Sequence, residues 1–189
     1  MPFESNSSPN IVNGINVDDV HALINTVKEN PADGVTRWRV KTEWRGRTHN
    51  RTTVEGFEIG GDFVARPFTI DIDEPEQLGG ANRHANPQEH LLAAVNSCMM
   101  VGFTALCALR GVKLDKLEME TTGDIDLRGF LGLNDKVPAG YPSLNTTVRV
   151  SGDASPEIFE EIMAAVRATS PNYFNITREV ALNADLIVD

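Results

Sequence analysis

Residues 86–111 read NPQEHLLAAVNSCMMVGFTALCALRG and form the most continuous helix signal in the chain. Asn86 is a preferred N-cap residue, Pro87 suits the first helical position, and Glu89 completes a capping box three residues after the cap. Gly111 is typical of the position just past a helix end. These signals predict one helix about 36 Å long at the usual rise per residue.

Apolar or small side chains occupy nearly every side of this predicted helix between residues 91 and 109. A helix that is apolar all round has to be buried on all sides. One domain of this size rarely has enough other elements to enclose such a helix, so we expect the helix to lie between two copies of the chain. The sequence therefore predicts an obligate homodimer.

The rest of the chain shows strand patterns interrupted by two further helices. Before the long helix we expect a helix over residues 17–30, capped by Asn16, and strands at about 37–44, 47–55, 57–64 and 66–72. After it we expect strands at about 114–127, 143–151 and 178–188, and a helix from Pro156 that ends before Ser170. This order predicts an α+β fold and not the strict alternation of a parallel sheet. We divide the chain into an N-terminal arm and helix, residues 1–35, and one main domain, residues 36–189.

The composition argues against several classes of protein. The formal net charge of the 189 residues is −10, whereas a nucleic-acid-binding surface needs clustered Lys and Arg. The sequence does not open with a basic and then apolar leader, and the apolar run at residues 99–109 is short for a membrane span. We therefore expect a cytoplasmic protein that binds neither nucleic acid nor membrane. Two cysteines do not make a disulfide framework in a chain of this length.

Several motifs occur together at fixed spacing. The helix signature at residues 86–94 is followed by Cys98, by Arg110-Gly111-Val112, by RGFLGL at residues 128–133 and by Ser170-Pro171. In this combination the sequence resembles the OsmC/Ohr family of osmotically inducible and organic-hydroperoxide-resistance proteins. The resemblance is good over residues 86–189, faint over residues 36–85 and absent from residues 1–35.

The resemblance implies an OsmC-like fold, in which curved antiparallel sheets wrap around long central helices in an intertwined homodimer. Characterised members are thiol peroxidases that reduce organic hydroperoxides. Carried over to this chain, Cys98 would be the nucleophile, Arg47 or Arg51 would activate it, and Glu89 would be the acid that holds the arginine. In the family a second cysteine resolves the oxidised product. Ser170 stands at that position, so the resemblance is to OsmC-like proteins that lack the second cysteine.

The expected surroundings of Cys98 bear on its reactivity. Its helical neighbours are small or apolar, and an apolar niche suits an organic peroxide but disfavours a thiolate. A reactive Cys98 therefore needs a cation from another element, for which Arg47 and Arg51 are the candidates. Glu89 and Cys107 each lie nine residues from Cys98, about 13.5 Å along the helix, so neither can touch it within one chain. We expect Cys107 to be a core cysteine that forms no disulfide with Cys98.

The sequence predicts neither a cofactor nor a metal site. His90 lies eight residues from Cys98, about 12 Å along the helix, which is too far for a Cys–His pair. His21, His49 and His84 have no metal-ligand spacing with either cysteine, so a zinc site is not expected.

Two functions remain open. In the first, Cys98 reduces a small organic hydroperoxide and is then reset by an external thiol reductant. In the second, the homodimer binds a small apolar ligand in its interface pocket and Cys98 has no catalytic part. Ser170 in place of the resolving cysteine favours the binder, whereas Cys98 together with the candidate arginines favours the enzyme.

Overall fold

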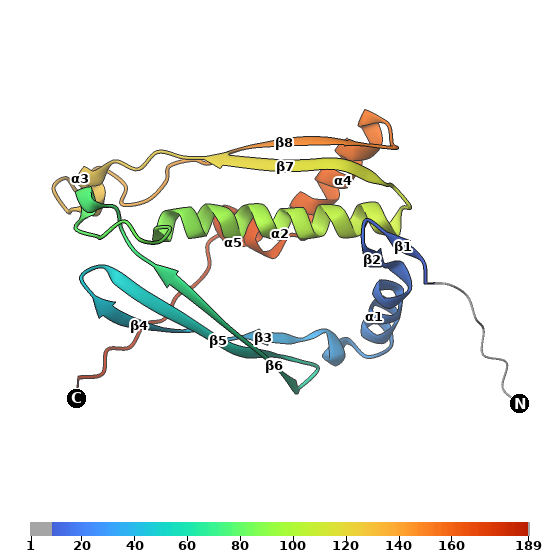
Figure 1. Ribbon diagram of the computed structural model, residues 1–189, viewed down its shortest axis with the longest axis horizontal. Helices are drawn as coiled ribbons and strands as arrows, with labels where there is room; N and C mark the ends of the chain where they lie inside the picture. The colour runs from blue at the N-terminus through green and yellow to red at the C-terminus, as the bar shows by residue number, and fades with distance from the viewer. Residues whose placement is uncertain (1–8, 189) are drawn as a thin grey trace, which may run out of the picture. The chain divides into compact units, whose positions relative to one another are not determined.

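The computed structural model of the protein describes residues 9–188, so the first eight residues of the predicted arm lie outside the described part. The chain divides into two compact units, one that ends at Leu91 and one that begins at Leu92. Each combines helices with antiparallel strands, which confirms the predicted α+β class (Figure 1). The predicted boundary after residue 35 stays a prediction.

The first unit is built around a four-stranded antiparallel sheet. Its elements are β1 (Ile11–Val12), β2 (Ile15–Asn16), α1 (Val17–Glu29), the 3-10 turn η1 (Pro31–Gly34), β3 (Thr36–Trp38), β4 (Lys41–Gly46), β5 (His49–Ile59), β6 (Asp62–Ile72) and a second 3-10 turn η2 (Glu76–Leu78). β3 and β4 pair with different halves of β5, and β6 pairs with nearly the whole of β5. Helix α1 is confirmed, and its predicted cap, Asn16, accepts a hydrogen bond from the backbone N–H of Asp18 at 3.2 Å.

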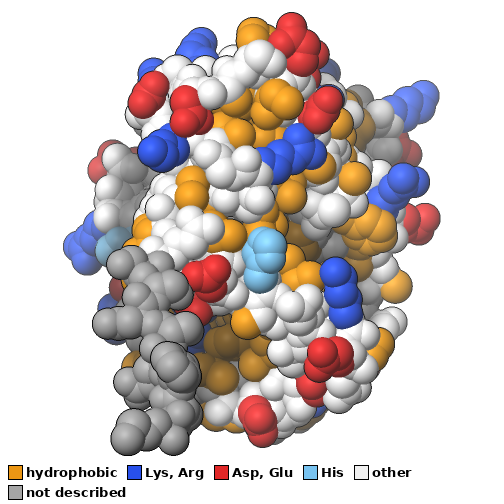
Figure 2. All heavy atoms as spheres, turned by 90° about the vertical axis from the view of Figure 1, so that its right-hand side faces the viewer, with side chains coloured by type: hydrophobic (Ala, Val, Ile, Leu, Met, Phe, Trp, Pro, Cys, Tyr) orange, Lys and Arg blue, Asp and Glu red, His pale blue; other side chains and the backbone are white. Residues whose placement is uncertain are grey.

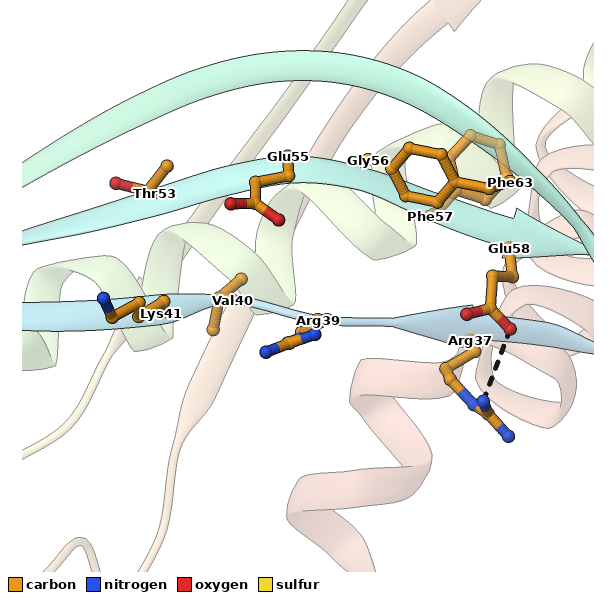
Figure 3. Close-up of a pocket in the computed structure, with 10 residues that line it drawn as sticks. All are labelled: Arg37, Arg39, Val40, Lys41, Thr53, Glu55, Gly56, Phe57, Glu58 and Phe63. Carbon is orange, nitrogen blue, oxygen red and sulfur yellow. Dashed lines mark ion pairs between the residues drawn. The ribbon is translucent and has the colours of Figure 1, made fainter.

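The structure corrects the strand boundaries predicted between residues 37 and 72. The first predicted strand is divided into two separate strands, β3 and β4. The next three predicted strands form only two long strands, β5 and β6, which a turn at Gly60 and Gly61 joins. Gly56 does not end a strand but lies inside β5, at a bulge in its pairing with β6. A Cβ on Gly56 would come within 2.3 Å of the Val64 carbonyl oxygen and 2.6 Å of the Phe63 ring, which lies against this glycine in Figure 3. Gly56 thus marks a close approach of two strands.

The second unit packs helices against a two-stranded antiparallel sheet. Its elements are α2 (Pro87–Leu109), which starts in the first unit, β7 (Leu114–Thr122), α3 (Leu127–Phe130), β8 (Asn145–Gly152), α4 (Pro156–Thr169) and α5 (Pro171–Thr177). The strand predicted to reach residue 127 stops at Thr122. Asp126 caps the short helix α3 by accepting a hydrogen bond from the Arg128 N–H.

Both predicted ends of the long helix α2 are confirmed. The Asn86 side chain accepts a hydrogen bond from the Glu89 N–H at 2.8 Å, and the Glu89 carboxylate accepts one from the Asn86 N–H at 2.7 Å. This is the reciprocal capping box that the sequence predicts. Gly111 follows the helix with φ +71°, a conformation that favours glycine.

The core of the second unit is a stripe along α2. Four side chains at every fourth position, Val95, Met99, Phe103 and Cys107, are at most 2% exposed and pack with Ile162 and Val166 of α4. The opposite face is open in the single chain, where Val101 on the same helix is 67% exposed. The predicted burial of this face between two copies of the chain stays a prediction.

By length and composition α2 also meets the minimal criterion for a membrane-spanning helix. The core helix of a soluble protein meets the same criterion, and one face of α2 is packed in the core of the second unit. The cytoplasmic location and the lack of membrane binding therefore stay predictions.

The predicted last strand at residues 178–188 is wrong for the single chain. These residues form neither helix nor strand, and Leu182 and Leu186 are 90% exposed. The apolar alternation is typical of a strand, but a strand also needs a partner for its N–H and C=O groups. None of the described strands of this chain pairs with the segment.

Replacing Ile162 by Ala should lower the free energy of unfolding by about 2–5 kcal/mol, because it opens a cavity against the α2 stripe. Urea unfolding followed by circular dichroism measures the loss. Glu160→Ala, an exposed position on the same helix, should change stability by less than about 0.5 kcal/mol. Equal losses in the two variants would contradict the core described above.

Candidate active site

Cys98 lies on α2 and contacts the residue that stands in place of a second cysteine. The Ser170 hydroxyl donates a hydrogen bond to the Cys98 sulfur at 3.3 Å. Ser170 is also the N-cap of α5, and its hydroxyl oxygen accepts a hydrogen bond from the Tyr173 N–H at 3.4 Å. Because that N–H occupies one lone pair of the oxygen, the hydroxyl hydrogen is free to point at the sulfur.

A further contact between α5 and α2 keeps Cys98 and Ser170 close together. The Asn172 side chain donates to the Ala94 carbonyl at 2.9 Å, which ties α5 to α2 one turn before Cys98. Ser170 is only 6% exposed, whereas Cys98 is half-buried. The sulfur therefore has a fixed polar partner on one side and remains open to a reactant.

Apolar side chains are exposed next to this pair. Val101 lies one helical turn after Cys98 and is 67% exposed, and Phe174 lies one turn after Ser170 and is 57% exposed. Apolar surface beside a half-buried sulfur suits a reactant with a hydrocarbon group, as the sequence predicts for this niche.

Cys107 is the core cysteine that the sequence predicts. It is fully buried in the α2 stripe, and burial raises the pKa of its thiol. Both cysteines are free, and they lie nine positions apart on one regular helix.

The two candidate arginines belong to the first unit and differ in their surroundings. Arg47 lies in the turn between β4 and β5 at φ +51°, and with Arg83 it lines a hollow of about 370 Å³. Arg51 on β5 is occupied: its Nε and Nη2 atoms donate to the two carboxylate oxygens of Asp71 at 2.9 and 3.0 Å. The role of either arginine toward Cys98 stays a prediction.

Glu89 makes the capping contact at the start of α2, which accounts for its presence without a catalytic role. Its predicted part in holding an arginine stays a prediction. The neighbouring His90 buries its Nε2 atom without a hydrogen-bond partner among the described residues.

Two acidic residues at the end of β6 organise the first unit, and the sequence predictions missed both. The Arg51 guanidinium, followed by the His49 ring, lowers the pKa of Asp71 to about 2. Asp73 is 1% exposed, and the Thr48 hydroxyl together with backbone N–H groups lowers its pKa to about 2 despite its burial. The signal was present as the alternation Ile70-Asp71-Ile72-Asp73, which puts both acids on one face of a strand.

A second hollow of about 300 Å³ lies on the sheet of the first unit (Figure 3). Its charged and aromatic lining residues are Arg37, Arg39, Lys41, Glu55, Glu58, Phe57 and Phe63. Arg37 pairs with Glu58 at 3.4 Å, as drawn by the dashed line. Cations and acids lie side by side here, so this hollow does not have the one-sided charge of an anion site.

The sequence matches the model of one protein family. Residues 79–185 match the family described as OsmC-like protein, a segment that contains both Cys98 and Ser170. The match covers more than half of the 189 residues. The chain belongs to the OsmC-like protein family, as its motifs predict.

The chain is also similar to a curated bacterial protein over part of its length. Over 88 residues the chain is 25% identical to uncharacterized protein YmaD of Bacillus subtilis (strain 168), which covers 47% of this chain and 53% of YmaD. The chain thus spans about half the length of this curated relative.

Solved structures show the same fold. An OsmC-like protein from Mycoplasma pneumoniae has a TM-score of 0.59 at 13% identity, over 75% of this chain and 87% of that one. An OsmC-like protein of unknown function from Vibrio cholerae has a TM-score of 0.52 at 15% identity, over 72% of this chain and 91% of that one. The predicted OsmC-like fold is therefore confirmed.

Replacing Ser170 by Cys should create a disulfide with Cys98, because the replaced oxygen already contacts the sulfur at 3.3 Å. Mass spectrometry of the peroxide-treated variant, alkylated without reduction, should find this bridge at high yield. Ser155→Cys, at the opposite end of α4, should form no bridge. A bridge between Cys98 and Cys107 in the unmodified protein would contradict the helix geometry.

Proposed function

We propose that this protein is a one-cysteine thiol peroxidase that reduces small organic hydroperoxides at Cys98. The observation that carries the proposal is the hydrogen bond from the Ser170 hydroxyl to the Cys98 sulfur. A donor to sulfur stabilises the anionic thiolate over the neutral thiol, and the thiolate is the nucleophile. Membership of the OsmC-like family supports the same reading.

The proposed reaction has one oxidative step. The Cys98 thiolate attacks the terminal oxygen of a hydroperoxide ROOH, a sulfur–oxygen bond forms, and the O–O bond breaks. The leaving alkoxide takes up a proton and departs as the alcohol ROH, while sulfur becomes a sulfenic acid. The Ser170 hydroxyl, held by the Tyr173 N–H, would keep its hydrogen bond to sulfur throughout.

The reset needs a thiol from outside the chain. Ser170 cannot form a disulfide, and Cys107 is buried in the core. An external thiol would displace water from the sulfenic acid to give a mixed disulfide, and a second thiol would release Cys98 as thiol and leave as the external disulfide.

Activation of the thiolate would also use a cation from the first unit. Arg47 is exposed and makes no ion pair within 4 Å among the described residues, whereas Arg51 already binds Asp71. We therefore favour Arg47, with Arg51 second. To hold an arginine, Glu89 would have to use the same carboxylate that accepts the capping hydrogen bond at the start of α2.

Cys98→Ser should abolish the consumption of cumene hydroperoxide in the presence of dithiothreitol, because the nucleophile is gone. Cys107→Ser should retain it. Ser170→Ala should slow the oxidation of Cys98 by about tenfold, the size of one hydrogen bond to a charged group. Stopped-flow kinetics with single-turnover amounts of peroxide measure this step.

Arginine variants distinguish a residue that activates Cys98 from one that only adds charge to the surface. Alkylation of Cys98 at pH 7 should slow about tenfold or more in Arg47→Ala or Arg51→Ala, since a contacting cation favours the thiolate. Arg37→Ala, which removes an exposed ion pair with Glu58, is the control and should leave the rate unchanged. Peroxide consumption that persists in Cys98→Ser would overturn the proposal.

A second candidate function is the binding of a small apolar ligand without catalysis. The second unit has a groove of about 540 Å³, within the usual size of a ligand pocket, between β8 and α4. Its apolar lining includes Phe103, Val148, Phe159 and Met163. Binding of a fatty acid by the protein, together with a slow reaction of Cys98 with peroxide, would favour this second function over catalysis.

We also propose that the working form is a homodimer. Apolar side chains that one chain cannot cover include Val101 on α2, Trp38 and Trp44 on the sheet, and Leu182 and Leu186 in the C-terminal segment. Figure 2 shows apolar side chains reaching the surface between charged ones on one face. Exposed large apolar side chains in both units are what a second copy of the chain would cover.

Sedimentation at sub-micromolar concentration should give a mass of twice the 20.7 kDa chain, with no folded monomer on dilution. Val101→Glu should weaken the dimer by placing a charge on the exposed face of α2. The matched control is Leu133→Glu, because Leu133 lies in a loop and its side chain is 71% exposed. A stable folded monomer in the unmodified protein would refute the dimer.

A further inference from the structure

Three metal-binding side chains converge in the first unit. His49 begins β5, Asp71 lies near the end of β6, and His84 lies in the loop between η2 and α2. One ligand atom from each lies within 4.8 Å of the other two. The His49 and His84 rings stack with their centroids 5.4 Å apart.

The distances suit a metal ion of ordinary size. His49 Nε2 lies 2.9 Å from Asp71 Oδ1. Two atoms bonded to zinc at their usual lengths stand about 2.9–3.4 Å apart for angles between octahedral and tetrahedral values. His84 is exposed on its loop, so rotation of its side chain can bring its ring nitrogen to the same centre.

Asp73 holds both histidine segments in place. Its Oδ1 atom accepts a hydrogen bond from the hydroxyl of Thr48, the residue before His49, at 2.7 Å. Its Oδ2 atom accepts one from the N–H of Arg83, the residue before His84, at 3.3 Å. The two histidines are thus positioned by one buried carboxylate.

Arg51 binds the same carboxylate as the proposed ion, so the ion has to share Asp71 with this arginine. A carboxylate oxygen has two lone pairs, and Asp71 Oδ1 uses them for His49 Nε2 and Arg51 Nε. An ion that replaces the hydrogen between His49 and Asp71 leaves both Arg51 hydrogen bonds intact. Arg51 would then orient the ligand carboxylate from behind, as partners of metal ligands commonly do.

We propose that His49, Asp71 and His84 form a binding site for a divalent transition-metal ion, with zinc as the best-matched case. Two imidazoles and one carboxylate are a common zinc ligand set, and three protein ligands leave a position open to water. The site uses no cysteine as a ligand, and its metal binding does not depend on the proposed peroxidase. His49, Asp71 and His84 show no metal-ligand spacing in the sequence, because two strands and a loop bring them together only in the folded chain.

Zinc binding to the full chain tests the proposal. The protein is prepared without a histidine tag, stripped with a chelator, and carries Cys98→Ser so that the Cys98 thiol does not compete for zinc. Calorimetric titration with zinc chloride should give one ion per chain. His84→Ala should weaken binding by at least about tenfold, the loss seen when even a partner of a metal ligand is removed. His21→Ala, an exposed histidine on α1, should bind like the parent.

A second measurement covers the possibility that a variant unfolds. Asp71→Asn and His49→Ala are checked by circular dichroism, and zinc should raise the melting temperature of the parent and of His21→Ala only. The cobalt-loaded parent should show the visible bands of a nitrogen and oxygen site, which His84→Ala loses. No saturable binding by the parent, or binding that survives His84→Ala and depends on His21, overturns the proposal.

Discussion

The burial of every fourth side chain of α2 against α4 is the contact on which the second unit depends. Val95, Met99, Phe103 and Cys107 form the buried row, so the rotation of α2 about its own axis is fixed. Cys98, one residue before a member of this row, is thereby held at the edge of the core. The end of α4 then places Ser170 beside its sulfur. The same row commits Cys107 to the core and removes it from any chemistry at the surface.

The parts of this structure that the sequence predicts depend on residues within a helical turn or two of one another. The capping box of Asn86 and Glu89, the stop at Gly111 and the cap at Asn16 are of this kind. The core position of Cys107 follows from the same periodicity. The position of Ser170 beside Cys98, 72 residues away, came from family resemblance alone, and the structure bears it out.

The errors and omissions have a common cause, which is that they depend on partners far away in the chain. Gly56 looks like a break in the sequence but is a close approach of β5 and β6. Residues 178–188 have a strand pattern but no paired strand within one chain. Asp73 could not be recognised as an anchor, because Thr48 and the N–H groups of Ala81 and Arg83 reach it only after the sheet and loop have folded.

The hydroxyl that stands beside Cys98 has a consequence for the order of the proposed reaction. A second cysteine in that position would act at a fixed local concentration, so the lifetime of the oxidised sulfur would be independent of thiols in solution. With Ser170 there, each oxidised sulfur of the proposed peroxidase would have to wait for a bimolecular collision with an external thiol. The lifetime of the oxidised state would then vary inversely with the surrounding thiol concentration. At a steady supply of peroxide, the oxidised fraction of the protein would itself become a measure of how much thiol its surroundings hold.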